Sequence, residues 1–181
     1  YNLSHKITGE TIKSKINRLL KYIKSKNIDN IFISAPENVA WLLNLRGKDN
    51  PFSPMPNCKI ILTRQKKIYF FSCPKKINKI KKIRPYNNFE FLTYKNFEKT
   101  VKELSGKNFC IDASTCSIAN EKVIKQKFKV KNYQDPCYLM KSIKNSTEIK
   151  NIKNSHIKDG LALTKFIFWI KNKIHKKITE I

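Results

Sequence analysis

The fold is decided by residues 30–72, which read NIFISAPENVAWLLNLRGKDNPFSPMPNCKIILTRQKKIYFFS. The apolar run NIFIS predicts a short buried strand, and Pro36 marks the first turn of a short helix that follows it. The runs CKIILT (58–63) and KIYFFS (67–72) flank a short polar turn, which is the pattern of a β-hairpin. Between the helix and the hairpin lies the loop 46–57, which contains three of the seven Pro residues of the chain.

Helices and strands alternate on both sides of this stretch. Upstream, Thr8 to about Ser25 is predicted to form one amphipathic helix, with Thr8 as its N-terminal cap. Downstream, the predicted elements are a helix at 75–83 that stops before Pro85, a strand at 89–93, a helix at 95–104, a strand at 108–112, a helix at 117–127 and a strand at 128–133. This order predicts an α/β fold, with a mixed sheet of about six strands and helices on both faces.

The character of the sequence changes after Asp135, from where it reads as helical to the end. Asn145 and Glu148 approximate a capping box at the start of a long C-terminal helix. Its apolar positions repeat at three and four residues: Ile149, Ile152, His156, Leu163, Ile167, Ile170 and Ile174. A helix this apolar is expected to be covered, by the sheet domain, by a second copy or by a domain outside this chain. Gly160 is expected to mark a close crossing of another element.

The net charge is extreme, because 38 Lys and Arg face 13 Asp and Glu, a formal balance of +25. Such a charge suits a nucleic-acid or membrane-surface partner, but codon bias also enriches Lys, Asn and Ile. Only four of the basic residues are Arg, and the lysines are spread along the whole chain. We therefore favour bias and expect no nucleic-acid partner. The cluster Lys75, Lys76, Lys79, Lys81 and Lys82 is read as a solvated helix face instead of a phosphate site.

No metal site can be read from the cysteines and histidines. The five Cys residues form no C-x-x-C pair and are expected to be buried free thiols in a reducing cytoplasm. His156 is interpreted as a core or domain-interface residue, because it lacks partners at metal-ligand spacing. Asp112 ends a predicted strand and is interpreted as a turn or capping residue. No apolar run approaches the ~18 residues that a membrane span needs.

Two segments carry a family resemblance. In the first, AWLLNLRGKDNPFSP, the matching residues are Trp41, Leu42, Asn44, Arg46, Gly47, Asp49, Pro51 and Pro54. In the second, KSIKNSTEIKNIKNSHIKDGLAL, they are Lys141, Lys144, Asn145, Glu148, His156, Asp159, Gly160, Ala162 and Leu163. Together, and in this order, the segments resemble the cytosolic three-domain Xaa-Pro aminopeptidases (aminopeptidase P) of the creatinase/prolidase superfamily.

The resemblance implies a division of labour along the chain. Residues 1–142 would be the non-catalytic middle domain, of creatinase/prolidase N-terminal type, and 143–181 the first helix of the catalytic domain. The family removes an N-terminal residue that precedes Pro, using two divalent ions, manganese or zinc. The metal ligands of the family lie beyond this sequence, so we expect no catalytic or metal-binding residue in the chain and no activity from it alone. Peptides with a penultimate Pro, the catalytic domain and a second copy are the implied partners, and the cytoplasm the implied location.

The loop 46–57 is the candidate functional segment. By resemblance it faces the catalytic domain, so Trp41, Arg46 and Asp49 are the candidate residues of the substrate cleft. A structural interpretation is also open: Trp41 and Leu42 would fill the core, Arg46 would pair with Asp49, and Gly47 would supply a positive φ. A stand-alone basic module that binds nucleic acid or another polyanion is the alternative function. It predicts steep salt dependence and lysines gathered on one face.

Overall fold

The computed structural model describes residues 1–83 and 88–172, with only the backbone for 82 and 83. The expected stop before Pro85, and Ile174 of the apolar stripe, lie outside these residues. The chain forms two units, Tyr1–Ile143 and Lys144–Ile181. The elements of the first are α1 (His5–Thr8), α2 (Ile12–Ser25), β1 (Asn30–Ile33), α3 (Pro36–Leu42), β2 (Lys59–Thr63), β3 (Ile68–Phe71), α4 (Pro74–Ile83), β4 (Phe89–Leu92), a 3₁₀ turn (Tyr94–Asn96), α5 (Phe97–Glu103), β5 (Asn108–Ile111), α6 (Ile118–Lys125), β6 (Lys129–Asn132) and α7 (Pro136–Ser142). The second contains α8 (Ser146–Lys171).

The strands form one mixed sheet in the order β4-β3-β2-β1-β5-β6. The predicted hairpin is confirmed, because β2 and β3 pair antiparallel, with Ile60 opposite Phe70. β1 pairs antiparallel with β2 and parallel with β5, while β3–β4 and β5–β6 are parallel pairs. The predicted mixed sheet of about six strands is therefore confirmed at six.

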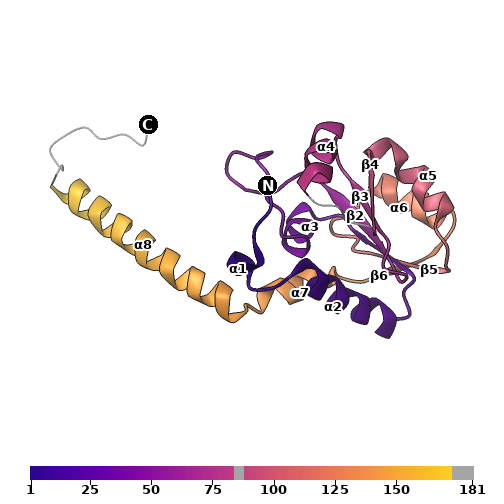
Figure 1. Cartoon of the computed structure of the whole chain (residues 1–181), viewed down its shortest axis with the longest axis horizontal. Helices are drawn as coiled ribbons and strands as arrows, with labels where there is room; N and C mark the ends of the chain where they lie inside the picture. The colour runs from indigo at the N-terminus through magenta and orange to yellow at the C-terminus, as the bar shows by residue number, and fades with distance from the viewer. Residues whose placement is uncertain (84–87, 173–181) are drawn as a thin grey trace. The chain divides into compact units, whose positions relative to one another are not determined.

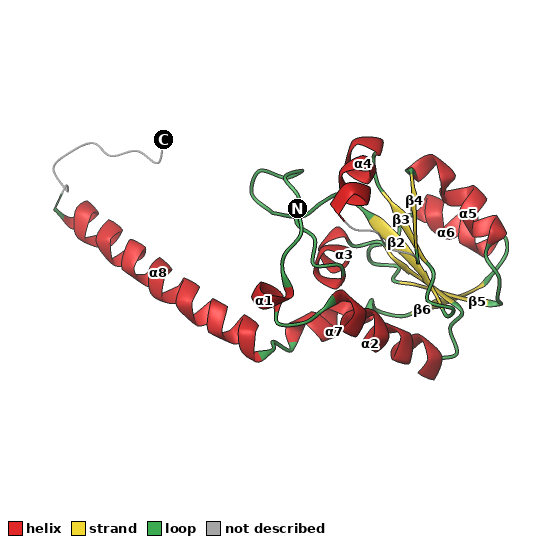
Figure 2. Cartoon of the chain, in the orientation of Figure 1, coloured by secondary structure: helices red, strands yellow, loops and turns green. Residues whose placement is uncertain are grey.

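Helices cover both faces of the sheet (Figures 1 and 2): α2, α3, α4 and α7 lie on one face, and α5 and α6 on the other. The strands are buried on both faces, and β1 shows how the residues divide. Ile31 and Ile33 pack with the α2 and α3 side chains, whereas Phe32 points to the opposite face and packs on Phe97, with ring centroids 5.0 Å apart. Two apolar layers separated by the sheet thus form the core of the first unit.

The N-terminal helix is shorter than predicted, and its cap is a different residue. Thr8 ends the one-turn helix α1, because Gly9 adopts a left-handed backbone conformation at φ 71°. α2 then begins at Ile12, and its cap is Thr11, whose Oγ1 accepts a hydrogen bond from the Ser14 amide at 3.2 Å. The prediction that Thr8 caps a helix reaching Ser25 was therefore wrong, because Gly9 breaks the helical path between the two segments.

A buried polar network joins the end of β5 to α3 and α7. The carboxylate of Asp112 accepts hydrogen bonds from the amides of Ser114 at 3.0 Å and Asp135 at 2.8 Å, which confirms its role in a turn. The carboxylate of Asp135 in turn accepts from Asn38 Nδ2 at 2.7 Å. Lys141 Nζ donates to Asn38 Oδ1 at 2.6 Å. Asn38 thus bridges an acid and a base, and this fixes α3 against α7.

The second unit begins with the predicted capping box. Asn145 Oδ1 accepts from the Glu148 amide, and Glu148 Oε2 accepts from the Asn145 amide, both at 2.9 Å. The apolar side chains of α8 are exposed, and their cover stays a prediction. His156 is exposed on the same helix, and its core or domain-interface role stays a prediction. No atom of its own unit lies within 4 Å of a Cβ built at Gly160, and the close crossing expected there stays a prediction.

Four of the five cysteines are buried, as predicted, and Cys73 is half-buried. Burial raises the pKa of the Cys58 thiol to about 12, so this thiol is poorly suited to nucleophilic chemistry. Among the residues that the structure describes, no helix is long and apolar enough to cross a membrane.

Candidate functional site

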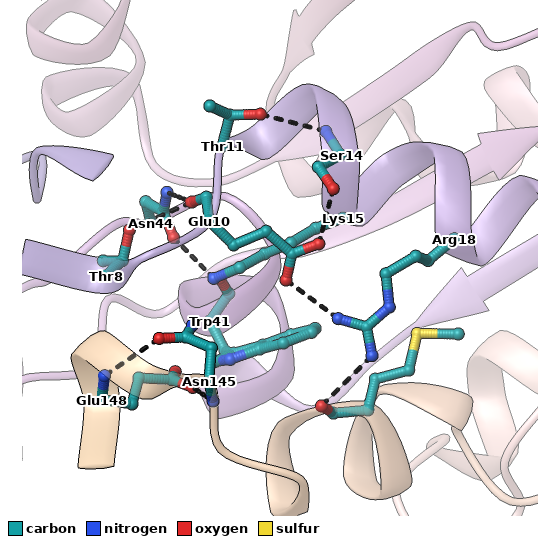
Figure 3. A network of polar contacts seen from close by, with 11 residues as sticks. Thr8, Glu10, Thr11, Ser14, Lys15, Arg18, Trp41, Asn44, Asn145 and Glu148 are labelled. Atoms are coloured by element: carbon teal, nitrogen blue, oxygen red, sulfur yellow. Dashed lines mark hydrogen bonds and ion pairs between the residues drawn. The ribbon is translucent and has the colours of Figure 1, made fainter. Parts of the chain in front are cut away.

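The candidate loop is positioned by the end of α3. Asn44 follows the helix with φ 50°, a conformation that Asn tolerates better than most residues, and its side chain is buried. Asn44 Nδ2 donates to the Glu10 carbonyl at 3.0 Å, and Asn44 Oδ1 accepts from Lys15 Nζ at 2.7 Å (Figure 3). The Leu3 amide donates to the Asn44 carbonyl at 2.8 Å. Three segments thus hold the point where the chain enters the loop.

Trp41 packs against α2 through two cations. Lys15 Nζ lies 4.3 Å from the Trp41 ring centroid and also donates to the Trp41 carbonyl at 2.9 Å. Arg18 lies 5.8 Å from the same ring and is held by Glu10 at 2.9 Å (Figure 3). The indole Nε1 of Trp41 is buried and has no hydrogen-bond partner in the described part of the chain. Leu42 is fully buried, as its core role predicts, whereas Trp41 is only half-buried.

Arg46 does not pair with Asp49, so this part of the structural interpretation was wrong. Its Nη1 instead donates to two backbone carbonyls, of Leu45 at 2.7 Å and of Ala40 at 3.3 Å. Burial lowers the pKa of the guanidinium below its ordinary value, although the group stays charged at neutral pH. The described residues provide no carboxylate partner for Arg46. The result is a half-buried, oriented cation without a counter-ion in the part of the chain that the structure describes.

Asp49 is bound to Lys76 of α4 instead. Its Oδ2 also accepts a hydrogen bond from the Asn57 amide, so one carboxylate closes the loop and ties it to α4. Burial alone would raise the pKa of Asp49, but the Lys76 and Asn57 hydrogen bonds and the Lys76 charge outweigh it, and the pKa lies below 3.8. Lys75, Lys79 and Lys81 of the same helix are exposed, as the solvated-face interpretation predicts, while the side chain of Lys82 lies outside the description.

Replacing Asp49 by Asn is expected to destabilise the chain by about 0.5–1 kcal/mol at pH 7, the range for a partly exposed ion pair. A carboxylate with a lowered folded pKa contributes stability above pH 3.8 and loses it as the pH falls through the folded pKa. Urea unfolding between pH 7 and pH 2.5 should therefore show that the free energies of unfolding of the wild type and Asp49→Asn become equal at the acid end. A constant gap over this range would mean that the ion pair does not stabilise the loop.

Gly47 is required for close packing and not for a positive φ, which corrects the second part of the structural interpretation. A Cβ on Gly47 would lie 2.6 Å from the Cα of Pro56. The Gly47 amide also donates to the Pro54 carbonyl at 2.9 Å. At the tip of the loop Phe52 is 96% exposed. The base of the loop is therefore tightly packed while its tip faces solvent.

Sequence reasoning brought Trp41, Arg46 and Asp49 into one segment, but no hydrogen bond or ion pair joins any two of them in the part of the chain that is described. It missed the two lysines that position this segment. Lys15 stood at a position of α2 that the apolar spacing assigns to the core, and a cation there signals a buried acceptor. Lys76 was hidden in a lysine-rich helix and carried no comparable signal.

No metal fits the donor set of the described residues. Groups of three His, Cys, Asp or Glu side chains placed to hold an ion are absent from residues 1–83 and 88–172. Asp49, the carboxylate of the candidate loop, is occupied by Lys76 and the Asn57 amide.

Comparison with known proteins decides the family. Residues 1–148 match the model of the creatinase/prolidase N-terminal domain. The chain belongs to this family. The creatinase/prolidase N-terminal domain described here is 33% identical to Xaa-Pro aminopeptidase 1 of Dictyostelium discoideum over 98% of the chain, and 30% identical to Xaa-Pro aminopeptidase ApepP of Drosophila melanogaster over 93%. It spans 28% of the length of each of these relatives.

The fold of this creatinase/prolidase N-terminal domain is also found in a solved structure. The X-prolyl aminopeptidase of Caenorhabditis elegans, described as a cytosolic enzyme with a di-nuclear active site, matches 96% of the chain with a TM-score of 0.77 at 22% identity. The chain covers 29% of that protein. The predicted family and fold are therefore confirmed, while the roles of Trp41, Arg46 and Asp49 and the boundary at 142/143 stay predictions.

Proposed function

We propose that this chain is the non-catalytic middle domain of a metal-dependent Xaa-Pro aminopeptidase, followed by the first helix of its catalytic domain. In this proposal residues 1–142 shape one wall of the substrate cleft and restrict access to short peptides, and 143–181 begin the catalytic unit. The relatives named Xaa-Pro aminopeptidase, each more than three times as long as the match, support the proposal. The cytoplasm is the proposed location, in line with the cytosolic C. elegans enzyme and the free cysteines.

The observation that carries the proposal is the guanidinium of Arg46, which finds no carboxylate partner among the described residues. This half-buried cation is held by two backbone carbonyls and is therefore oriented in advance. Asp49, the nearby carboxylate, is already satisfied by Lys76 and Asn57. The candidate segment thus offers an oriented cation and, among the described residues, no vacant carboxylate, which suits the carbonyl and carboxylate oxygens of an extended peptide.

The chemistry itself would come from outside this chain. Two divalent ions, manganese or zinc, are proposed for the catalytic domain, where such ions activate water and polarise the scissile carbonyl. The described residues of this chain hold no ligand set for them. Their part would be to orient the peptide and to exclude longer or folded chains, and Arg46 would be a positioning residue.

Replacing Arg46 by Met in the complete gene product is expected to lower kcat/KM for Ala-Pro-Leu by about tenfold, the size of one charge-assisted hydrogen bond. The loss should lie in KM, because a residue that only positions the peptide binds ground state and transition state alike. Arg64→Met is the matched control, since Arg64 lies in the β2–β3 turn and contacts Asn27 and Asp29.

An unchanged KM in Arg46→Met would contradict the positioning role. A fall in kcat that accompanies a lowered unfolding midpoint would assign Arg46 to structure alone.

The alternative function, a basic module that binds nucleic acid or another polyanion, stays a prediction. Against it, lysines lie on helices of both faces of the sheet. On α5 and α6 Lys102 pairs with Glu98 and Lys125 with Glu121, and Lys67 pairs with Glu90 on the sheet itself.

A further inference from the structure

A cavity of about 410 Å³ lies beside the candidate loop, within the first unit. The start of the loop, the N-terminal residues 1–2 and α4 form its walls. Leu45, Pro56 and Ile80 contribute apolar surface, and the volume is that of a small-molecule site. The cavity was not anticipated by any motif, because its lining comes from three segments far apart in the sequence.

The charged groups of this cavity are unevenly matched. Asp49 and Lys76 neutralise one another across the wall. Lys48 and Lys79 also line the cavity, and the described residues offer neither of them a hydrogen bond or an ion pair. With three cations and one anion, the lining carries a surplus of positive charge next to apolar surface. That combination is complementary to an anion attached to an apolar body.

The walls are firm enough to act as a site. Leu45 is only 6% exposed and belongs to the apolar core, against which Ile80 also packs. Pro56 is locked against Gly47, where even a methyl group would not fit. The Asp49–Lys76 ion pair connects loop and helix across the cavity. A ligand would therefore meet a largely preformed surface, which lowers the ordering cost of binding.

We propose that this cavity binds the C-terminal residue of a peptide. Its apolar side chain would lie against Leu45, Pro56 and Ile80, and its α-carboxylate would interact with Lys48 and Lys79. A free inorganic anion would leave the apolar walls uncovered, and an uncharged peptide end would leave both lysines unmatched. The inference rests on the proposed function in that the ligand is a peptide, and it adds a preference for short peptides with a free carboxyl end.

The test is an NMR titration of the ¹⁵N- and methyl-labelled 181-residue chain with Ala-Pro-Ala-Leu and with its C-terminal amide. The free acid should shift the Lys48 and Asp49 amides and the Ile80 methyl signals. The amide should bind at least about tenfold more weakly, as loss of a charge-assisted contact requires. Binding by the acid should weaken as salt is raised.

A double variant distinguishes binding by the cavity lysines from a general effect of the positive charge of the chain. Lys48→Gln with Lys79→Gln should weaken binding of the acid by about tenfold or more. Lys13→Gln with Lys21→Gln removes the same charge from the exposed face of α2 and should leave binding unchanged. The proposal would be overturned if the acid and the amide bound equally well, or if the two double variants had equal effects on binding. It would also be overturned if inorganic phosphate caused the same chemical-shift changes, or if the peptide caused none at millimolar concentration.

The outcome is independent of catalysis, because the titration follows binding to a chain that is not required to hydrolyse the peptide. If the complete gene product fails to cleave Xaa-Pro peptides while the acid still binds at Lys48 and Ile80, the proposed function fails and the subsite stands. If cleavage occurs and the titration shows no preference for the acid, the subsite fails alone.

Discussion

Replacing Asn38 by Ala is expected to lower the free energy of unfolding of the chain by about 3 kcal/mol, because it removes one hydrogen bond from the buried Asp135 carboxylate and another from the half-buried Lys141 ammonium. Asn38 is fully buried, donates to the Asp135 carboxylate at 2.7 Å and accepts from Lys141 at 2.6 Å. Without it, the largely buried Asp135 carboxylate keeps the hydrogen bond from the Cys137 amide at 2.8 Å but loses the one from Asn38 Nδ2. Urea unfolding at pH 7 measures the loss.

The pH dependence gives this prediction a second readout. Burial raises the pKa of Asp135 above 3.8, although the Asn38 and Cys137 hydrogen bonds oppose the shift. An acid with a raised folded pKa is penalised in its ionised form, and the penalty is relieved as the pH falls through that pKa. The difference in free energy of unfolding between Asn38→Ala and the wild type should therefore become smaller towards acid pH. The exposed Asn17→Ala on α2 serves as the control and should change stability by less than about 0.5 kcal/mol. A loss below about 1 kcal/mol in Asn38→Ala would show that the network does not hold α3 to α7.

Replacing Trp41 by Ala is the second substitution with a large expected effect, a loss of about 3 kcal/mol. The ring packs on α2 beneath Lys15 at 4.3 Å and Arg18 at 5.8 Å, so its removal leaves a cavity and exposes a buried cation. Trp169→Ala, on the exposed helix α8, is the matched control and should lie within about 0.5 kcal/mol of the wild type. Equal effects of the two substitutions in urea unfolding would contradict this account of the α2–α3 contact.

Trp41→Phe separates the ring from its polar group. It keeps an aromatic face for the cations and removes the buried Nε1–H that lacks a partner. The chain should therefore stay within about 1 kcal/mol of the wild type, since the lost indole area is offset by removal of an unsatisfied donor. A much larger loss would indicate that Nε1 is satisfied in solution by the chain itself.

Most of the fold could be predicted from the sequence, because the patterns that indicate its helices and strands are local. The pattern NIFIS, the hairpin runs and the capping box of Asn145 and Glu148 each depend on residues close in the chain, and the structure has all three. The break after Thr8 was missed because an apolar spacing that begins at Ile12 is compatible with either start. The left-handed backbone conformation of Gly9 ends the first helix and so places the start of α2 at Ile12.

The candidate site was less predictable because its contacts are not local. Arg46 and Asp49 are three residues apart and of opposite charge, so a local pair was the natural expectation. In the structure both residues have other partners. Asp49 is bound by Lys76, 27 residues away, and Arg46 donates to a backbone carbonyl at the end of α3. Lys15, 29 residues from Asn44, is another partner that no spacing rule could select. The site depends on which segments the sheet brings together, and that information appears only in the folded chain.

The central claim is that these residues form a scaffold beside a reaction chamber and supply none of the reacting groups. It is tested most directly by assaying Ala-Pro-Leu hydrolysis, with added Mn²⁺, by the 181-residue chain and by the complete gene product under the same conditions. The account predicts cleavage before Pro by the complete product and none by the chain. Metal-dependent turnover by the purified chain would contradict it.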